Sequence, residues 1–246
     1  MIIGSRFIFR EETGSTNVDA ASLAGAENTP EGAIVHAGFQ LAGRGQKGNK
    51  WESERGKNLL FSIILYPTTV SPAEQFIISM VISLGISDYL KTIIDNVKIK
   101  WPNDIFAGND KIAGILIENS ISGDSIVSSV AGIGLNVNQN RFPDFVPKAV
   151  SLKMLTGKEY DLGECLTRLS VFLDKRYKQL LAGKNIKIKE EYISSLYRLN
   201  ELNHFRSSGS EFKGRIISVN QSGCLMVETE NGRIRDFAFR EIEFIH

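Results

Sequence analysis

Residues 97–137 read VKIKWPNDIFAGNDKIAGILIENSISGDSIVSSVAGIGLNV, and this stretch decides the fold. It consists of β-rich runs separated by short turn signals, Gly108-Asn109-Asp110 and Ser122-Gly123. The turns predict two hairpins, one that pairs residues 104–107 with 111–118 and one that pairs 112–121 with 125–137. Because strands joined by short turns run antiparallel, we expect a mixed, largely antiparallel sheet.

Outside this stretch, strand-like and helix-like segments alternate without a fixed repeat. Strands are predicted at residues 6–10, 33–38, 59–66 and 97–101. Helices are predicted at about residues 15–26, 71–94, 161–183 and 187–199. The clearest helix start is Ser71-Pro72-Ala73-Glu74, where serine is a good N-cap, proline suits the first turn and glutamate follows three positions after the serine. The sequence therefore predicts an α+β fold in which helices pack against the sheet.

The character of the chain changes after His204. Residues 211–246 carry short alternating strands with turns at 221–223 and 230–232, and the second turn contains an Asn-Gly pair that is typical of hairpins. About 40 residues rarely form an independent core, so this part is expected to be a small β-barrel that leans on the rest of the chain. We therefore predict a main domain over residues 1–203 and a small C-terminal β-domain over residues 204–246.

The composition excludes several classes of protein. The 246 residues include 29 Lys and Arg and 28 Asp and Glu, and a net charge of +1 is too small for bulk electrostatic binding of nucleic acid. The uncharged stretch 75–87 has 13 residues, whereas a membrane-spanning helix needs roughly 20. The N-terminus lacks the apolar core of a signal peptide, and Cys165 and Cys224 form no CxxC pair. We expect a cytoplasmic protein with no nucleic-acid or membrane partner.

A basic, glycine-rich loop is the first candidate for a functional site. Residues 38–58 read GFQLAGRGQKGNKWESERGKN, with five basic and two acidic residues from Arg44 to Lys57. Such a loop can wrap an anion with its backbone N–H groups, and Trp51 offers a flat apolar lid. The spacing does not match a P-loop, because Asn49 stands in place of the lysine. A solvated surface loop is the alternative interpretation.

The segment Lys100-Trp101-Pro102-Asn103-Asp104 is the second candidate. Proline and the Asn-Asp pair favour a rigid corner directly after a strand. If the chain turns at residues 108–110, Asp104 lies across from Gly114 and Lys111 projects near the same end. A carboxylate and an ammonium group would then meet where the glycine backbone allows close approach. A purely structural corner and a surface salt bridge are the alternatives.

Taken together and in order, several segments resemble the motifs of the biotin–protein ligases. They are GSTN (14–17), QLAGRG (40–45), KGNKW (47–51), KWPND (100–104), KIAGIL (111–116) and GIGLN (132–136). The resemblance is close over residues 6–140, and the C-terminal β-domain is similar in placement and size. It implies a class II synthetase-like catalytic domain followed by an SH3-like β-barrel.

The resemblance implies an ATP-dependent biotin–protein ligase. In that family, biotin attacks the α-phosphate of ATP with Mg²⁺ present, which gives biotinyl-5′-AMP and pyrophosphate. The ε-amine of one lysine on a biotin carboxyl carrier domain of a carboxylase then takes the biotin, and AMP leaves. We expect ATP, Mg²⁺ and biotin as cofactor and substrates, and a monomer or homodimer. Because the chain begins almost at the first strand, we also expect a monofunctional type without the DNA-binding domain of repressor members.

The same resemblance assigns roles to individual residues. Contacts to biotin are expected from Ser15, Thr16, Asn17, Gln40, Gly43, Arg44, Gly45, Gln46, Lys111, Gly114 and Gly132. Contacts to ATP or the adenylate are expected from Arg44, Gln46, Trp51, Lys111 and Asn136. Lys111 and Arg44 are the expected catalytic residues, since positive charge must offset the repulsion between a carboxylate and a triphosphate. Asp104 is the one candidate metal ligand, and its alternative role is to orient Lys111.

The loop departs from the family pattern at two positions. Gln46 and Asn49 stand where family members frequently carry arginine, although Lys47 and Lys50 keep the loop positive. Since a neutral hydrogen bond is weaker than a charged one, we expect the adenylate to be held less tightly than in an arginine-bearing relative.

Two other functions stay open at this point. One is a lipoate–protein ligase of the same superfamily, which the polar set at residues 15–17 argues against. The other is a catalytically silent binding module, which the retention of both Arg44 and Lys111 argues against.

Overall fold

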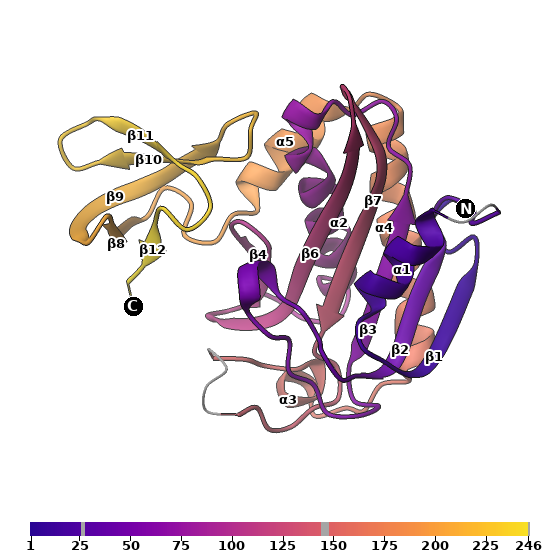
Figure 1. Ribbon diagram of the computed structural model, residues 1–246. Coiled ribbons are helices and arrows are strands. Elements are labelled where there is room, and N and C mark those ends of the chain that lie inside the picture. The colour runs from indigo at the N-terminus through magenta and orange to yellow at the C-terminus, as the bar shows by residue number, and fades with distance from the viewer. Residues whose placement is uncertain (26–27, 144–147, 246) are drawn as a thin grey trace.

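The computed structural model describes residues 1–25, 28–143 and 148–245, with Lys47 described by its backbone alone. Within these residues, a seven-stranded sheet forms the larger part and a five-stranded sheet follows at the C-terminal end (Figure 1). The strands of the first sheet are β1 (Phe7–Thr13), β2 (Ile34–Gln40), β3 (Leu59–Leu65), β4 (Val97–Lys100), β5 (Asp104–Ala107), β6 (Asp110–Ser122) and β7 (Ser125–Leu135). Their order is β1-β2-β3-β7-β6-β5-β4. Strands β1 and β2 pair in parallel and the other neighbours pair antiparallel, which confirms the mixed, largely antiparallel sheet.

The two hairpins predicted from residues 97–137 are confirmed. Gly108 and Gly123 adopt positive φ angles of 61° and 58° in the turns, a conformation that glycine reaches without strain. In the first hairpin Asp104 lies opposite Gly114, as the turn position predicted. In the second, Gly114 lies opposite Gly134, so β6 pairs with both β5 and β7 and forms the middle of the motif-bearing region.

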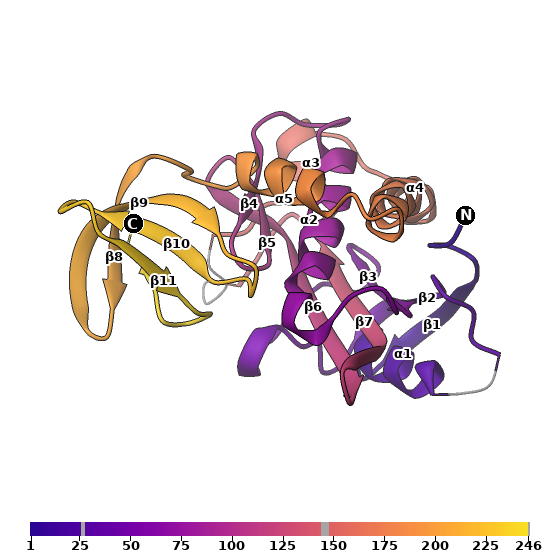
Figure 2. The same ribbon diagram turned by 90° about the horizontal axis from the view of Figure 1, so that it is seen from above.

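Helices cover the two faces of this sheet unequally (Figure 2). On one face lie α2 (Phe76–Leu90), α4 (Leu162–Leu181) and α5 (Asn185–Ser194), with α2 buried along nearly all of its length. The other face carries α1 (Thr16–Ala24), which packs on β2, β3 and β7 through a small apolar cluster centred on Ala20 and Val35. The short helix α3 (Leu152–Thr156) follows β7 in sequence. Because α1 is short, part of its face of the sheet stays open for a site.

The largest differences from the predicted helix boundaries lie in α2 and α5. Ser71–Glu74 forms a 3₁₀ turn (Pro72–Glu74) and α2 starts at Phe76, because the Ser71 hydroxyl contacts the Glu74 carboxylate at 3.2 Å and caps no backbone N–H. The same helix ends at Leu90 instead of residue 94. Helix α5 ends at Ser194 instead of residue 199, because the chain turns to the sheet and Tyr197 N donates to Ile99 O at 2.8 Å.

The C-terminal sheet is antiparallel and has the order β11-β10-β9-β8-β12. Its strands are β8 (Leu202–Ser207), β9 (Ser210–Val219), β10 (Leu225–Thr229), β11 (Ile234–Phe237) and β12 (Glu243–Phe244). Aromatic rings of Phe205, Phe212 and Phe237 pack together in it, consistent with a small SH3-like barrel. The expected domain boundary after residue 203 falls inside β8, and the division into two domains stays a prediction.

The C-terminal sheet leans on the first part of the chain, as its size predicted. Trp101 Nε1 donates to Gly223 O at 2.9 Å, and the Trp101 ring contacts Phe239 edge-on at a centroid distance of 6.4 Å. Gln221 Nε2 also donates to Glu74 Oε1 at 2.9 Å. The corner that begins at Trp101 therefore joins the two sheets.

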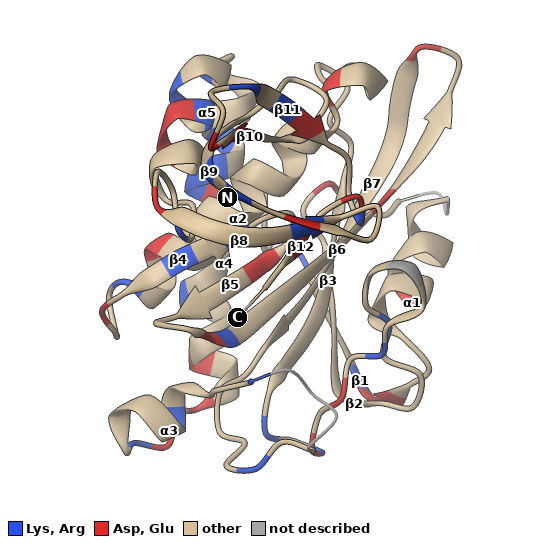
Figure 3. Ribbon diagram, turned by 90° about the vertical axis from the view of Figure 1, so that its left-hand side faces the viewer, with Lys and Arg blue, Asp and Glu red and all other residues tan. Residues whose placement is uncertain are grey.

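Acidic and basic residues are interspersed over the elements of both sheets (Figure 3). In that view the ribbon presents no face of a single charge, in keeping with the net charge of +1. None of the helices in the described ranges is long and apolar enough to span a bilayer.

Candidate active site

A cavity of about 260 Å³ lies on the α1 face of the large sheet. Residues from five places in the chain line it: the start of α1, the end of β2, the glycine-rich loop, the β4–β7 region and Phe239. The predicted site residues in its wall are Ser15, Thr16, Asn17, Gln40, Arg44, Gly45, Gln46, Trp51, Asp104, Lys111, Gly114 and Gly132. The structure therefore brings together residues that are more than 100 positions apart in sequence.

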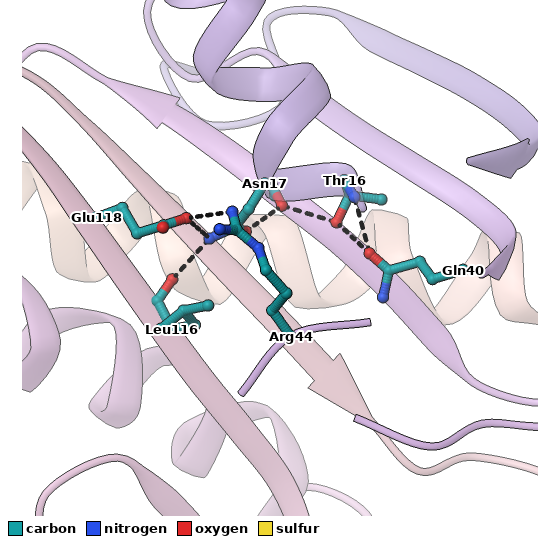
Figure 4. Close-up of polar contacts among 7 residues, drawn as sticks. Thr16, Asn17, Gln40, Arg44, Leu116 and Glu118 are labelled. Carbon is teal, nitrogen blue, oxygen red and sulfur yellow. Dashed lines mark hydrogen bonds and ion pairs between the residues drawn. The ribbon is translucent and has the colours of Figure 1, made fainter. Parts of the chain in front are cut away.

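One end of the cavity is a buried cluster of hydroxyl and carboxamide groups (Figure 4). The Thr16 hydroxyl and backbone N donate to Gln40 Oε1 at 3.1 and 2.7 Å. The Ser62 hydroxyl donates to Asn17 Oδ1 at 2.6 Å and lies 2.8 Å from the Thr16 hydroxyl. Ser62 is 0% exposed and Asn17 is 4% exposed. Such a cluster can present both donors and acceptors to a planar polar ligand group.

Gly132 makes room for this cluster. It lies opposite Ser62 in the β3–β7 pairing, and a Cβ atom added to it would stand 1.9 Å from Asn17 Oδ1. Asn17 therefore packs on the bare backbone of β7. Gly132 was predicted to let backbone approach biotin, and the structure shows that Asn17 occupies the space above it.

A pair of opposed glycines forms a flat floor beside the cluster. Gly114 and Gly134 are direct partners in the β6–β7 pairing, and the Trp51 indole lies over both. An added Cβ atom would stand 2.3 Å from the indole at Gly134 and 2.8 Å from it at Gly114. Trp51 Nε1 is buried and has no hydrogen-bond partner in the described residues. Trp51 thus covers the sheet inside the cavity. Its indole N–H is available to donate a hydrogen bond to a ligand.

Lys111 is held by the carboxylate that the hairpin register predicted. Its Nζ lies 2.7 Å from Asp104 Oδ1, with side-chain exposures of 27% and 24%. The Lys111 backbone is fixed separately, because its N donates to Lys148 O and its O accepts from Val150 N, both at 2.9 Å. The ammonium group also lies 5.6 Å from the centroid of the Trp51 ring. This contact favours an orienting role for Asp104 over a role as a metal ligand.

The glycine-rich loop folds back on itself at the mouth of the cavity. Arg44 pairs with Lys50 in an isolated β-bridge, and Gly45 N donates to Asn49 O at 2.7 Å. Trp51 N donates to Gly43 O at 3.0 Å, so Gly43 lies beside the cavity without lining it. Gly43 lines a neighbouring cavity of about 550 Å³ on the outer side of the loop. Arg44 lines both cavities.

Asn136 also lies outside the cavity wall. Its Nδ2 donates to Val150 O at 3.1 Å and to Lys111 O at 3.4 Å, and its backbone N donates to Ile112 O at 2.9 Å. Asn136 thus fixes the segment that carries Lys111. Its expected contact with the nucleotide stays a prediction.

Four further residues belong to the site and were given no role from the sequence, although Lys100 begins the candidate segment KWPND. Ser62 contacts the polar cluster, Glu118 pairs with Arg44 at 3.0 Å, Phe239 enters the cavity from the C-terminal part, and Lys100 lines its wall. Burial lowers the pKa of Lys100, although the nearby Asp104 opposes that shift. A signal existed for Glu118, since alternation along β6 places it on the same face as Gly114.

Comparison with known proteins identifies the family of this chain. The family model of the biotin/lipoate A/B protein ligases matches residues 13–138, slightly more than half of the chain. The chain belongs to this family. The matched range contains every expected site residue, including Lys111 and Asn136.

Relatives of this family match almost the whole chain. The bifunctional ligase/repressor BirA of Bacillus subtilis is 31% identical over 94% of this chain and 72% of the relative. The biotin–[acetyl-CoA-carboxylase] ligase of Paracoccus denitrificans is 30% identical over 90% and 93% of the two chains. The biotin protein ligase of Aquifex aeolicus, solved in complex with biotin and ATP, matches with a TM-score of 0.81 and 27% identity over 98% and 99%.

Proposed function

We propose that this chain is an ATP-dependent biotin–protein ligase. The observation that carries the proposal is the content of one cavity. It has a buried cluster of neutral polar groups around Asn17 at one end, and the cations of Arg44 and Lys111 in the same wall. Biotin has matching chemistry, with a neutral ureido ring at one end and a carboxylate at the other. The relatives named as biotin ligases, and the related structure with biotin and ATP, support the same conclusion.

The first step joins two anions. A carboxylate oxygen of biotin attacks the α-phosphate of ATP, an acyl–phosphate bond forms, and the bond to pyrophosphate breaks. Lys111 and Arg44 are proposed to lower the electrostatic cost, because two positive charges in the cavity wall would offset the repulsion between the carboxylate and the phosphates. Asp104 keeps the Lys111 ammonium group in place through the 2.7 Å contact.

The second step transfers biotin to protein. The neutral ε-amine of an acceptor lysine attacks the acyl carbon of the adenylate, an amide bond forms, and AMP leaves as the amine loses a proton. The acceptor is proposed to be a biotin carboxyl carrier domain, in keeping with the names of relatives that act on acetyl-CoA carboxylase.

Magnesium is proposed to enter with ATP. Mg²⁺ prefers about six oxygen ligands and often binds through substrate phosphates and water with one or two carboxylates. The described residues contain no group of three or more side chains that could hold a metal. The Asp104 carboxylate already engages Lys111. The ion is therefore proposed to bind chiefly through the phosphates of ATP, with Asp104 as the one candidate ligand from the chain.

A mass measurement tests the proposed function. The protein is incubated with biotin, MgATP and a biotin carboxyl carrier domain, and the carrier is weighed by mass spectrometry. We expect one biotinyl group on the carrier, and none on a carrier whose acceptor lysine is replaced by arginine. Replacement of biotin by lipoate should give no product. An unmodified carrier, or equal modification with lipoate, would show that the assignment is wrong.

The loop over residues 43–56 should become protected when ligands bind. Arg44 and Lys50 are exposed, and the glycines make ordering of the loop costly in entropy, so ligand contacts must supply the compensation. We expect tryptic cleavage after Arg44, Lys47 or Lys50 to slow when biotin and ATP are both present. Cleavage after Arg233, in the exposed turn between β10 and β11, serves as the control and should be unchanged. If the rate of cleavage in the loop is the same with and without both ligands, the loop does not close over them.

The residue at position 46 should control retention of the adenylate. Gln46 lines the cavity, and its Oε1 is buried without a hydrogen-bond partner in the described residues. An arginine there would add a charged hydrogen bond, which is stronger than a neutral one by about 1 kcal/mol, equivalent to roughly fivefold in off-rate. We expect Gln46→Arg to slow release of biotinyl-5′-AMP by about that factor in the absence of a carrier. Adenylate that leaks from the natural protein should also biotinylate nearby lysines.

The controls for position 46 separate charge from size. Gln46→Met keeps the length without polarity and should release the adenylate at least as fast as the natural protein. Gln46→Arg with Lys47→Ala tests compensation by Lys47, whose side chain lies outside the described parts of the structure. If this double variant releases the adenylate faster than both the natural protein and Gln46→Arg, the result would indicate that Lys47 compensates. Equal release from all variants would show that position 46 does not control retention.

A further inference from the structure

One carboxylate oxygen connects two side chains of the cavity wall (Figure 4). Glu118 Oε2 accepts a hydrogen bond from Asn17 Nδ2 at 2.8 Å and another from Arg44 Nη2 at 3.0 Å. Asn17 belongs to the neutral polar cluster, and Arg44 is one of the two cations. Glu118 was absent from the residues expected from the sequence, and it has no part in the mechanism described above.

The β6 strand explains why Glu118 reaches both partners. Side chains alternate along a strand, so Gly114, Leu116 and Glu118 share the face that carries the cavity. Leu116 O accepts from Asn17 Nδ2 at 3.3 Å, and Glu118 lies one step further along the same face. Glu118 is therefore placed by regular β-structure and not by a mobile loop.

Glu118 fixes the orientation of the Asn17 carboxamide. An ionised carboxylate only accepts hydrogen bonds, so it selects the Nδ2 side of the amide. On the opposite side, the Ser62 hydroxyl donates to Asn17 Oδ1 at 2.6 Å. The two contacts agree on one orientation, because a reversed amide would turn its oxygen toward the Glu118 carboxylate and Leu116 O, which are both acceptors.

Glu118 also holds Arg44 at the border of two cavities. Arg44 lines both the main cavity and the outer one, whereas Glu118 lines the outer one. The ion pair is 44% and 41% exposed, so its contribution to folding stability is expected to be small. The ion pair instead fixes the position of Arg44. Glu118 engages the Nη2 group, and the other N–H groups of the planar guanidinium remain available to an anion.

We propose that Glu118 is a positioning residue that orients Asn17 toward the ureido end of the ligand and Arg44 toward its reacting carboxylate. This inference rests on the proposed function and deepens it. One oxygen thereby links the strength of biotin binding to the rate of adenylate formation.

Two substitutions separate the two effects. Glu118→Gln keeps an oxygen acceptor and removes the charge, so Asn17 stays oriented while the hold on Arg44 weakens. We expect the Kd for biotin to stay within about twofold and the rate of pyrophosphate release at saturating substrates to fall about fivefold. Glu118→Ala removes both contacts, so the Kd for biotin should rise about tenfold and the rate should fall at least as far as in Glu118→Gln.

A matched control comes from an ion pair outside the cavity. Glu211 accepts from Arg206 Nη2 at 2.7 Å on the C-terminal sheet, with both side chains about half exposed. Glu211→Gln and Glu211→Ala should change neither the Kd for biotin nor the rate. The melting temperatures of all four variants should lie close to that of the natural protein.

A double-mutant cycle tests the route through Arg44. In an Arg44→Ala background, Glu118→Gln should lower the rate by less than about twofold, because interacting residues are non-additive. A full fivefold effect in that background would overturn the proposal. So would Glu118 variants that lower the melting temperature but leave the Kd and the rate unchanged. The natural protein is measured in parallel, and failure of that protein to form biotinyl-5′-AMP would instead contradict the proposed function.

Discussion

Lys111→Ala is expected to slow the formation of biotinyl-5′-AMP by about a hundredfold or more, comparable to the loss of one electrostatic donor at a reacting centre. Lys111 Nζ lies in the cavity wall, 2.7 Å from Asp104 and beside the Trp51 ring. Without this charge, the repulsion between the carboxylate and the phosphate grows as they approach, so the loss falls mainly on the transition state. The measurement is pyrophosphate release in a single turnover, with biotin and MgATP saturating.

The fold should survive this substitution, because the hydrogen bonds to Lys148 and Val150 use only the Lys111 backbone. Lys153→Ala is the matched control. Lys153 has nearly the same side-chain exposure, 26%, and its Nζ lies 3.3 Å from Glu159 Oε2. Neither residue lines the cavity. Its substitution should leave the rate unchanged. A Lys111→Ala protein that releases pyrophosphate at nearly the natural rate would remove Lys111 from the mechanism.

Gly132→Ala is expected to weaken biotin binding by about a hundredfold, because loss of one or two buried hydrogen bonds costs about 1–3 kcal/mol each. The added methyl group would stand 1.9 Å from Asn17 Oδ1 and 2.7 Å from Asn17 Cγ. Asn17 must move, and its contacts with Ser62, Leu116 and Glu118 are then lost together. The Kd for biotin in the absence of ATP, measured by calorimetry, reports the effect directly.

Two further variants identify the cause. Gly25→Ala adds the same methyl group at the end of α1, where none of the described residues lies within 4 Å of it, and should bind biotin normally. In an Asn17→Ala background, the clash with the carboxamide is absent, so Gly132→Ala should add less than about threefold. Independent, additive losses would mean that Gly132 acts on biotin by some route other than Asn17.

The central part of the fold could be predicted because it depends on local signals. Gly108 and Gly123 mark turns that set the registers of two hairpins, and the register alone placed Asp104 opposite Gly114. The ends of helices were less predictable, since they depend on distant contacts. Helix α5 ends where Tyr197 reaches Ile99, almost 100 residues earlier in the chain.

In the site, too, contacts between residues close in sequence were predictable and contacts between distant segments were not. Lys111 and Asp104 lie within one hairpin, so their contact followed from the sequence pattern. Ser62 and Glu118 reach Asn17 across 45 and 101 residues, and only the order of β3, β7 and β6 in the sheet brings them together. A serine in the wholly buried strand β3 was nevertheless a signal, because a buried hydroxyl group needs a partner.

The hydrogen bond from Trp101 to Gly223, together with Phe239 in the cavity wall, limits how this protein can be recombined. A chimera that takes residues 1–201 from this chain and the C-terminal sheet from a relative inherits an incomplete cavity, unless the donor supplies an aromatic ring at position 239 and a free carbonyl at position 223. The C-terminal sheet is thus not an interchangeable module. Substitutions at Trp101, Gly223 and Phe239 should constrain one another when family members diverge, although they lie in separate sheets.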